Sequence, residues 1–109
     1  MFEVNVLGLC MCTQQACKLM EESKVEDGHI VNLNSLAGHN VFPQAVFYSS
    51  TKFAVTALTE GLRQELRAKK SKTRVTAISP GVVKTPFIPK YVVEKKRFFF
   101  ELKFYYLKS

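Results

Sequence analysis

The fold of this chain is decided by residues 29–35, His-Ile-Val-Asn-Leu-Asn-Ser, together with residues 74–79, Arg-Val-Thr-Ala-Ile-Ser. Both runs are short and β-prone, and turn signals bound them: Asp27-Gly28 comes before the first run, and Pro80-Gly81 directly follows the second. A short apolar run of this kind is typical of a strand that is buried in a parallel sheet. We therefore expect two buried strands.

A segment with helical periodicity precedes each strand. In residues 4–22, apolar side chains recur every three, four or seven positions and cover much of the circumference, which predicts a helix buried on more than one side. Residues 47–70 repeat the helical pattern through Ala54, Leu58 and Leu62. Helix, strand, helix and strand with short connections predict an α/β fold with parallel strands and a right-handed crossover. A two-stranded parallel sheet has two open edges, which is typical of a piece of a larger sheet.

The composition fits one small globular domain of 109 residues, 47% of them hydrophobic, with a net charge of +7. Residues 90–109 contain six Lys or Arg and two acidic residues, so the basic character belongs mainly to this tail and we expect no nucleic-acid partner. No apolar run approaches the roughly 20 residues that span a bilayer, so we expect no membrane partner. The first residues lack the features of a signal peptide.

Three cysteines, Cys10, Cys12 and Cys17, lie in the first predicted helix. Their odd number and helical setting argue against a disulfide framework. The spacing of Cys10 and Cys12 is not that of a zinc knuckle, so we expect no bound metal. Reduced thiols predict a cytoplasmic location.

Residues 48–52, Tyr-Ser-Ser-Thr-Lys, contain the main candidates for chemistry. Tyr48 and Lys52 are four residues apart, so they lie on one face of a helix. An unperturbed phenol has a pKa of about 10 and is a poor base at neutral pH, but a nearby ammonium group favours the phenolate. Tyr48 is therefore a candidate general acid or base, with Lys52 supplying the charge. Taken in isolation, such a pair is more often an ordinary surface pair.

Ser35 and Pro80-Gly81 come at the ends of the two predicted strands. Ligands of open α/β sheets bind at the carboxyl ends of the strands. The hydroxyl group of Ser35 is therefore a candidate to hydrogen-bond a substrate oxygen while the charge on that oxygen changes. The two strand ends and the start of the second helix are expected to meet at one place.

These residues resemble the motifs of the short-chain dehydrogenase/reductase family. Residues 48–52 resemble its Tyr-x-x-x-Lys motif, and Ser35 lies 13 positions before Tyr48, the spacing typical of the family serine. Asn5 resembles the catalytic asparagine of the preceding helix, and residues 80–85 resemble the Pro-Gly-x-x-x-Thr segment. The motifs occur in the family order across residues 1–89, which makes the resemblance specific.

The resemblance implies a partial Rossmann-type parallel sheet, a fragment of a doubly wound fold, from an enzyme that interconverts an alcohol and its carbonyl compound. It implies that Tyr48 exchanges a proton with this small-molecule substrate, that Lys52 assists Tyr48 and contacts the nicotinamide ribose, and that Ser35 steadies the substrate oxygen. Asn5 would hold a water that links Lys52 to solvent, although an ordinary helix N-cap is the alternative for this residue.

The implied cofactor is NADP or NAD, with NADP favoured, and the hydride comes from the cofactor. The implied cofactor contacts are Tyr48, Lys52, Pro80, Gly81, Val83 and Thr85. The family also implies a homo-oligomer formed through the two helices.

Two departures from the family leave the function open. The Gly-rich turn that cradles the pyrophosphate at a helix start has no counterpart in these 109 residues. Residues 90–109 match no family segment, so we divide the chain into a catalytic-half fragment, residues 1–89, and an atypical basic, aromatic tail. The alternatives to an enzyme are a non-catalytic fragment that pairs with a full-length subunit and a basic binding module that uses the tail.

Overall fold

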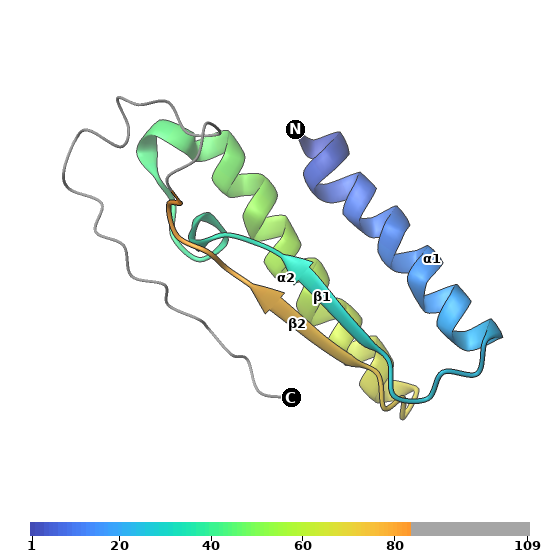
Figure 1. Cartoon of the computed structure of the whole chain (residues 1–109). Helices are drawn as coiled ribbons and strands as arrows, with labels where there is room; N and C mark the ends of the chain where they lie inside the picture. The colour runs from blue at the N-terminus through green and yellow to red at the C-terminus, as the bar shows by residue number, and fades with distance from the viewer. Residues whose placement is uncertain (84–109) are drawn as a thin grey trace.

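The computed structural model describes residues 1–83, which form two long helices and a parallel two-stranded sheet (Figure 1). In chain order the elements are the π-helix η1 (Glu3–Gly8), α1 (Leu9–Glu22), β1 (His29–Leu33), the 3-10 helices η2 (Leu36–Gly38) and η3 (Pro43–Ala45), α2 (Val46–Ala68) and β2 (Arg74–Ile78). The predicted order of helix, strand, helix and strand is confirmed, and so is the α/β class.

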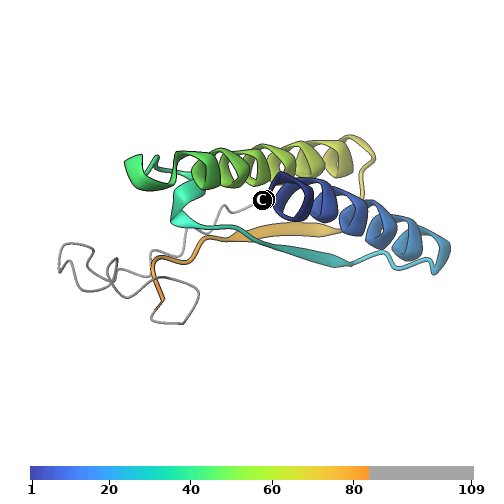
Figure 2. The ribbon, with the colours of Figure 1, turned by 90° about the horizontal axis from the view of Figure 1, so that it is seen from above.

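The sheet is held in a parallel register that runs from His29 opposite Arg74 to Leu33 opposite Ile78. The pairing continues beyond the strands, because the backbone N–H of Asn34 donates to the carbonyl of Ile78 at 2.7 Å. Helix α2 connects the two strands and lies across one face of the sheet, whereas α1 runs beside it on the β1 side (Figures 1 and 2). The two strands therefore end at the same edge, as the sequence predicts.

The buried interior of residues 1–83 contains more polar than apolar side chains. The buried apolar side chains are Ala37, Val55 and Val75. The buried polar side chains are Asn32, Asn34, Ser49, Thr51, Thr59 and Ser79. Since a buried polar group destabilises the fold unless it is hydrogen-bonded, the packing of α2 on the sheet depends on directional bonds.

The first helical segment, η1 followed by α1, differs from its prediction, because none of its residues is buried in the described structure. In η1, Val4 is 77% exposed and Leu7 is exposed; in α1, Met11 is 66% exposed and Leu19 is exposed. Two strands and one helix offer too little surface to cover a helix that is apolar on several sides. The expectation of burial on more than one side is therefore wrong for the described residues. Neither α1 nor α2 is long and apolar enough to cross a membrane.

Both helices end in the same left-handed turn. At the end of α2, the N–H of Ser71 donates to the carbonyl of Leu66 at 2.9 Å, and the N–H of Lys70 donates to that of Arg67 at 2.9 Å. This pair of bonds is the Schellman motif, and it places Lys70 at a φ of 54°. Helix α2 therefore ends at Ala68, before the Lys70 that the periodicity includes. Lys24 has the equivalent place after α1, with a φ of 55°.

We expect Lys70→Gly to raise the free energy of unfolding by about 0.5–1 kcal/mol, because a left-handed conformation costs a residue with a Cβ atom more than it costs glycine. Lys24→Gly should raise the free energy of unfolding by a similar amount, because Lys24 has the same left-handed conformation. Lys69→Gly is the matched control, since Lys69 has an ordinary φ of −77° and glycine there should lower stability. Urea denaturation of the three variants checks this, and a loss of stability in both left-handed variants contradicts it.

Candidate active site

Tyr48 and Lys52 lie one turn apart near the start of α2, and the structure brings their side chains together. The Nζ atom of Lys52 is 5.8 Å from the centroid of the Tyr48 ring, within the range of a cation–π contact. The predicted placement on one helix face is therefore confirmed. The ammonium group lies where its positive charge acts on the ring that bears the phenol.

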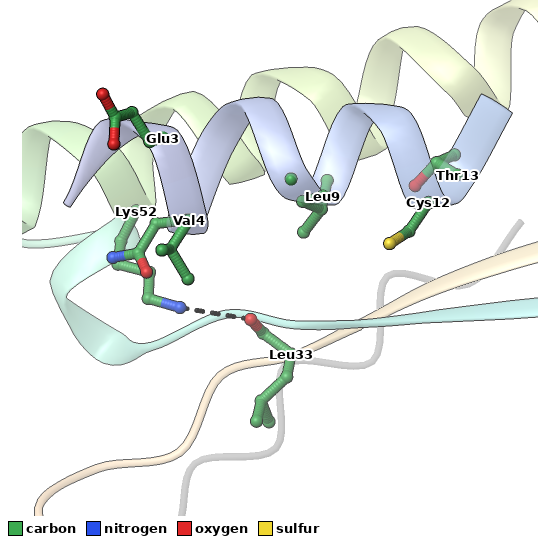
Figure 3. A pocket seen from close by; sticks show the side chains of 9 residues that line it. Glu3, Val4, Leu9, Cys12, Thr13, Leu33 and Lys52 are labelled. Atoms are coloured by element: carbon green, nitrogen blue, oxygen red, sulfur yellow. Dashed lines mark hydrogen bonds between the residues drawn. The ribbon is translucent and has the colours of Figure 1, made fainter. Parts of the chain in front are cut away.

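Lys52 also reaches the end of β1. Its Nζ atom donates to the carbonyl of Leu33 at 3.2 Å, which is the dashed line in Figure 3. Burial lowers the pKa of Lys52 from the ordinary lysine value, because removal from water disfavours the ammonium form. The Leu33 carbonyl accepts a hydrogen bond from the ammonium and so opposes this effect.

Ser35 lies two residues after β1 ends. Its Oγ atom accepts a hydrogen bond from the backbone N–H of Ala37 at 3.1 Å, so the side chain caps the short helix η2. Within residues 1–83, no hydrogen bond joins Ser35 to Tyr48 or to Lys52. The bond from Ala37 uses Ser35 only as an acceptor, so its O–H remains able to donate to another oxygen.

Asn5 lies in η1, and its side chain is tied to α2. Its Nδ2 atom donates to Oγ1 of Thr51 at 3.1 Å, and the Thr51 hydroxyl donates to the carbonyl of Tyr48 at 2.7 Å. Asn5 therefore contacts the helical turn that carries Tyr48 and Lys52. The alternative reading of Asn5 as an N-cap is wrong, because Phe2 is the N-cap of η1. The π-helical geometry was not predicted, and such turns are frequent at functional sites.

Pro80, Gly81 and Val83 follow β2 at the same edge of the sheet as Ser35. The carbonyl of Pro80 accepts a hydrogen bond from the N–H of Leu36 at 3.0 Å, so the segments after the two strands are joined. Thr85 lies outside the described residues, as does the whole of the tail.

Several polar residues that the sequence analysis did not single out support this edge. Asn34 is 4% exposed, and its Nδ2 atom donates to Oγ1 of Thr56 at 2.8 Å. The Thr56 hydroxyl lies 2.9 Å from the carbonyl of Gly38 and 3.2 Å from that of Lys52. The ring of His39 is hydrogen-bonded to the hydroxyl of Ser79 at 2.9 Å. The signal available in the sequence was an asparagine within the short β-prone run, Asn32, and a second one, Asn34, just before Ser35.

An open groove of about 580 Å³ lies between the first helical segment and the end of β1 (Figure 3). Its lining residues are Glu3, Val4, Asn5, Gly8, Leu9, Cys12, Thr13, Leu33 and Lys52. Lys52 therefore faces a space that is large enough for part of a ligand. Within residues 1–83, no group of three or more His, Cys, Asp and Glu side chains could hold a metal ion.

A parallel sheet crossed by a connecting helix, with polar side chains at the carboxyl ends of the strands, is the arrangement of part of a doubly wound α/β fold. The sequence profile of the short chain dehydrogenases matches residues 1–96. The chain belongs to this family.

Two curated relatives from this family are similar to the chain. The chain is 64% identical over 89 residues to dehydrogenase/reductase SDR family member 11 of Bos taurus. This match covers 80% of the chain and 35% of the relative. It is 49% identical over 94 residues to farnesol dehydrogenase of Aedes aegypti, and this match covers 84% of the chain and 38% of that protein. The chain thus spans little more than a third of the curated relatives it matches.

Solved structures agree with the fold. A 4-hydroxyisoleucine dehydrogenase complexed with NADH superposes with a TM-score of 0.73 at 33% identity, covering 86% of this chain and 37% of that one. ElxO with NADP bound superposes with a TM-score of 0.68 at 38% identity, covering 82% and 34%. The expectation of a partial Rossmann-type sheet is confirmed.

We expect Gly38→Ala to lower the free energy of unfolding by about 1–3 kcal/mol through overpacking. A Cβ atom at Gly38 would lie 2.7 Å from both the Asn34 Oδ1 atom and the Lys52 carbonyl, so the edge of the site must shift. Gly61→Ala is the matched control: no atom lies within 4 Å of a Cβ there, and alanine in mid-helix should add about 1 kcal/mol. Thermal unfolding measures both, and equal effects of the two substitutions contradict the close approach at Gly38.

Proposed function

We propose that the whole protein is an NAD(P)-dependent oxidoreductase that interconverts an alcohol and its carbonyl compound by hydride transfer. The observation that carries this proposal is the position of the Lys52 Nζ atom, 3.2 Å from the Leu33 carbonyl and 5.8 Å from the centroid of the Tyr48 ring. A cation fixed beside a phenol at the carboxyl ends of parallel strands is suited to proton exchange with a bound substrate.

Each proposed catalytic residue has one task. Tyr48 donates a proton to the carbonyl oxygen in reduction and removes it from the alcohol in oxidation. Lys52 holds its charged Nζ atom against the Tyr48 ring and contacts the nicotinamide ribose. Ser35 donates its free O–H to the substrate oxygen, because its Oγ atom otherwise only accepts the bond from Ala37. Asn5 orders the water through which Lys52 exchanges protons with solvent, while its Nδ2 atom holds Thr51.

The residues present fit one end of a nicotinamide cofactor. Lys52 faces a groove, and the backbone after β2 is fixed by the bond from Leu36 to Pro80. We propose that the nicotinamide end is held by Tyr48, Lys52, Pro80, Gly81, Val83 and Thr85. The cofactor, when bound, supplies or accepts the hydride. The family resemblance favours NADP over NAD, and the two solved structures named above contain NADP and NADH.

The pyrophosphate end has no matching residues in the 109-residue chain. Its five glycines are Gly8, Gly28, Gly38, Gly61 and Gly81, and no two of them lie close enough to make a Gly-rich turn. This observation favours a second candidate function, a non-catalytic fragment that pairs with a full-length subunit. The exposed apolar side chains of α1 fit such pairing, as they fit the homo-oligomer that we propose for the whole protein.

The division into residues 1–89 and a separate tail remains a prediction, and so does the cytoplasmic location. The third alternative, a basic binding module, depends on the tail and therefore lies outside the described residues.

A chimera tests the proposed function most directly. Residues 1–89 of this chain would replace the matching stretch of the Bos taurus relative, which is 64% identical there and supplies the rest of the fold. We expect the chimera to oxidise alcohols with NADP, and Tyr48→Phe in it to lower kcat by at least about 100-fold, because general acid–base catalysis contributes that much.

Ser50→Ala is the matched control in the chimera, since Ser50 is an exposed neighbour whose hydroxyl only donates to the Phe47 carbonyl. Its kcat should stay within about twofold of the parent chimera. A folded chimera that binds NADPH but has no activity supports the non-catalytic fragment instead. Activity that survives Tyr48→Phe overturns the role of Tyr48.

The 109-residue chain by itself should bind NADPH only weakly, with a Kd of about a millimolar or above, because it lacks a helix start that cradles the pyrophosphate. Fluorescence titration of the chain with NADPH measures this value. The chimera, which regains the cradle from the relative, is the positive control. A micromolar Kd for the 109-residue chain contradicts the expectation.

A further inference from the structure

We propose that Asn34 and Thr56 are positioning residues that fix the turn of α2 bearing Tyr48 and Lys52 against the end of β1. This inference rests on the proposed function for its catalytic meaning, but the geometry belongs to the chain alone. Neither residue touches the Tyr48 ring or the Lys52 Nζ atom through any hydrogen bond of the described structure, so they act through the backbone of the helix.

The Thr56 hydroxyl joins three segments of the chain. It accepts the hydrogen bond from Asn34 Nδ2 at 2.8 Å, which comes from the residue directly after β1. It also lies 2.9 Å from the Gly38 carbonyl in η2 and 3.2 Å from the Lys52 carbonyl in α2. Since a hydroxyl has one hydrogen, it shares this donor between the two carbonyls. One atom thus fixes the distances among the strand end, η2 and the helix.

Asn34 is anchored to the sheet on its other side. Its backbone N–H donates to the Ile78 carbonyl at 2.7 Å, which extends the pairing with β2. Asn34 is 4% exposed and its Oδ1 atom already has no hydrogen-bond partner, so a conformation that breaks the bond to Thr56 would leave its buried Nδ2 group unpaired as well. The backbone of Asn34 is therefore fixed by its bond to β2, and its side chain connects this fixed position to α2.

Lys52 is attached both to the end of β1, through its Nζ atom, and to Thr56, through its backbone carbonyl. It lies one turn before Thr56, and its Nζ atom bonds to the carbonyl of Leu33, the residue next to Asn34. Both ends of the turn from Lys52 to Thr56 are thus attached to consecutive residues of the strand end. Rotation or sliding of α2 would break both attachments together, and the Lys52 ammonium would move away from the Leu33 carbonyl.

A second pair of the same chemistry supplies a matched control. Asn32 Nδ2 donates to Thr59 Oγ1 at 3.0 Å, and the Thr59 hydroxyl donates to the Val55 carbonyl at 2.8 Å. Thr59 is 2% exposed, so its loss should destabilise the fold at least as much as the loss of Thr56. In the described structure, its hydroxyl has no hydrogen bond to the Lys52 carbonyl or to η2.

The test compares Thr56→Val, Thr56→Ser and Thr59→Val in the full 109-residue chain, with the pH titration of the Lys52 Cε signal followed by NMR. In the starting chain this titration should have a midpoint below that of an exposed lysine, because burial lowers the pKa of Lys52. The titratable groups that share its surroundings are Tyr48 on α2, Glu3 on η1 and Cys12 on α1, and all three are unchanged in the variants.

We expect Thr56→Val to move the Lys52 midpoint towards that of an exposed lysine, because a loosened turn lets water reach the ammonium. Thr56→Ser should keep the original midpoint, because it keeps the hydroxyl. Thr59→Val should lower stability and leave the midpoint in place. If Thr56→Val lowers stability without moving the midpoint, Thr56 is structural only and the proposal is overturned.

Asn34→Ser replaces Thr56→Val if the latter fails to fold, since serine is too short to reach Thr56 and water can satisfy its hydroxyl. The same shift of the midpoint supports the proposal, and an unchanged midpoint overturns it. Because no step of this experiment needs cofactor or activity, its result is independent of the chimera that tests the proposed function.

Discussion

Hydrogen bonds from asparagine side chains to threonine hydroxyl groups tie helix α2 to β1, to the residue after β1 and to η1. Three such bonds occur in the described structure, between Asn5 and Thr51, Asn32 and Thr59, and Asn34 and Thr56. Each threonine in turn donates to a backbone carbonyl one turn earlier in α2. Because few apolar side chains are buried, these directional bonds orient the helix, and they satisfy the buried Nδ2 groups of Asn32 and Asn34.

This constraint shapes the candidate site, because three consecutive residues at the end of β1 each hold a different part of it. The Leu33 carbonyl accepts the bond from Lys52, the Asn34 amide donates to Thr56, and the Ser35 hydroxyl caps η2. One strand end therefore orients the lysine, the helix and the loop together. Under the proposed function, which assigns the chemistry to Tyr48 and Lys52, the strand end helps α2 to position the reacting side chains.

The sequence predicted the four main elements and the α/β class, because periodicity and turn signals are local properties of the chain. It also predicted the Tyr48–Lys52 pair, since a four-residue spacing on a helix fixes a common face. It did not predict the end of α2 before Lys70, the π-helical turn around Asn5 or the bonds of Asn34, because these depend on turn geometry and on the register of α2 against the sheet. The prediction that the first helix is buried on more than one side was wrong, because apolar periodicity does not state which surface covers a helix. The catalytic and cofactor-binding roles of all the predicted site residues, Thr85 included, stay predictions.

The central claim is that the Lys52 ammonium lies beside the Tyr48 ring while it bonds to the end of β1. NMR cross-relaxation between the Lys52 Hε protons and the Tyr48 ring protons, measured on the labelled chain, tests it most directly. The account predicts clear cross-peaks between them, together with a signal from Lys52 that reports a hydrogen-bonded ammonium group. A Lys52 side chain that shows no contact with the ring and titrates like a free surface lysine would contradict it.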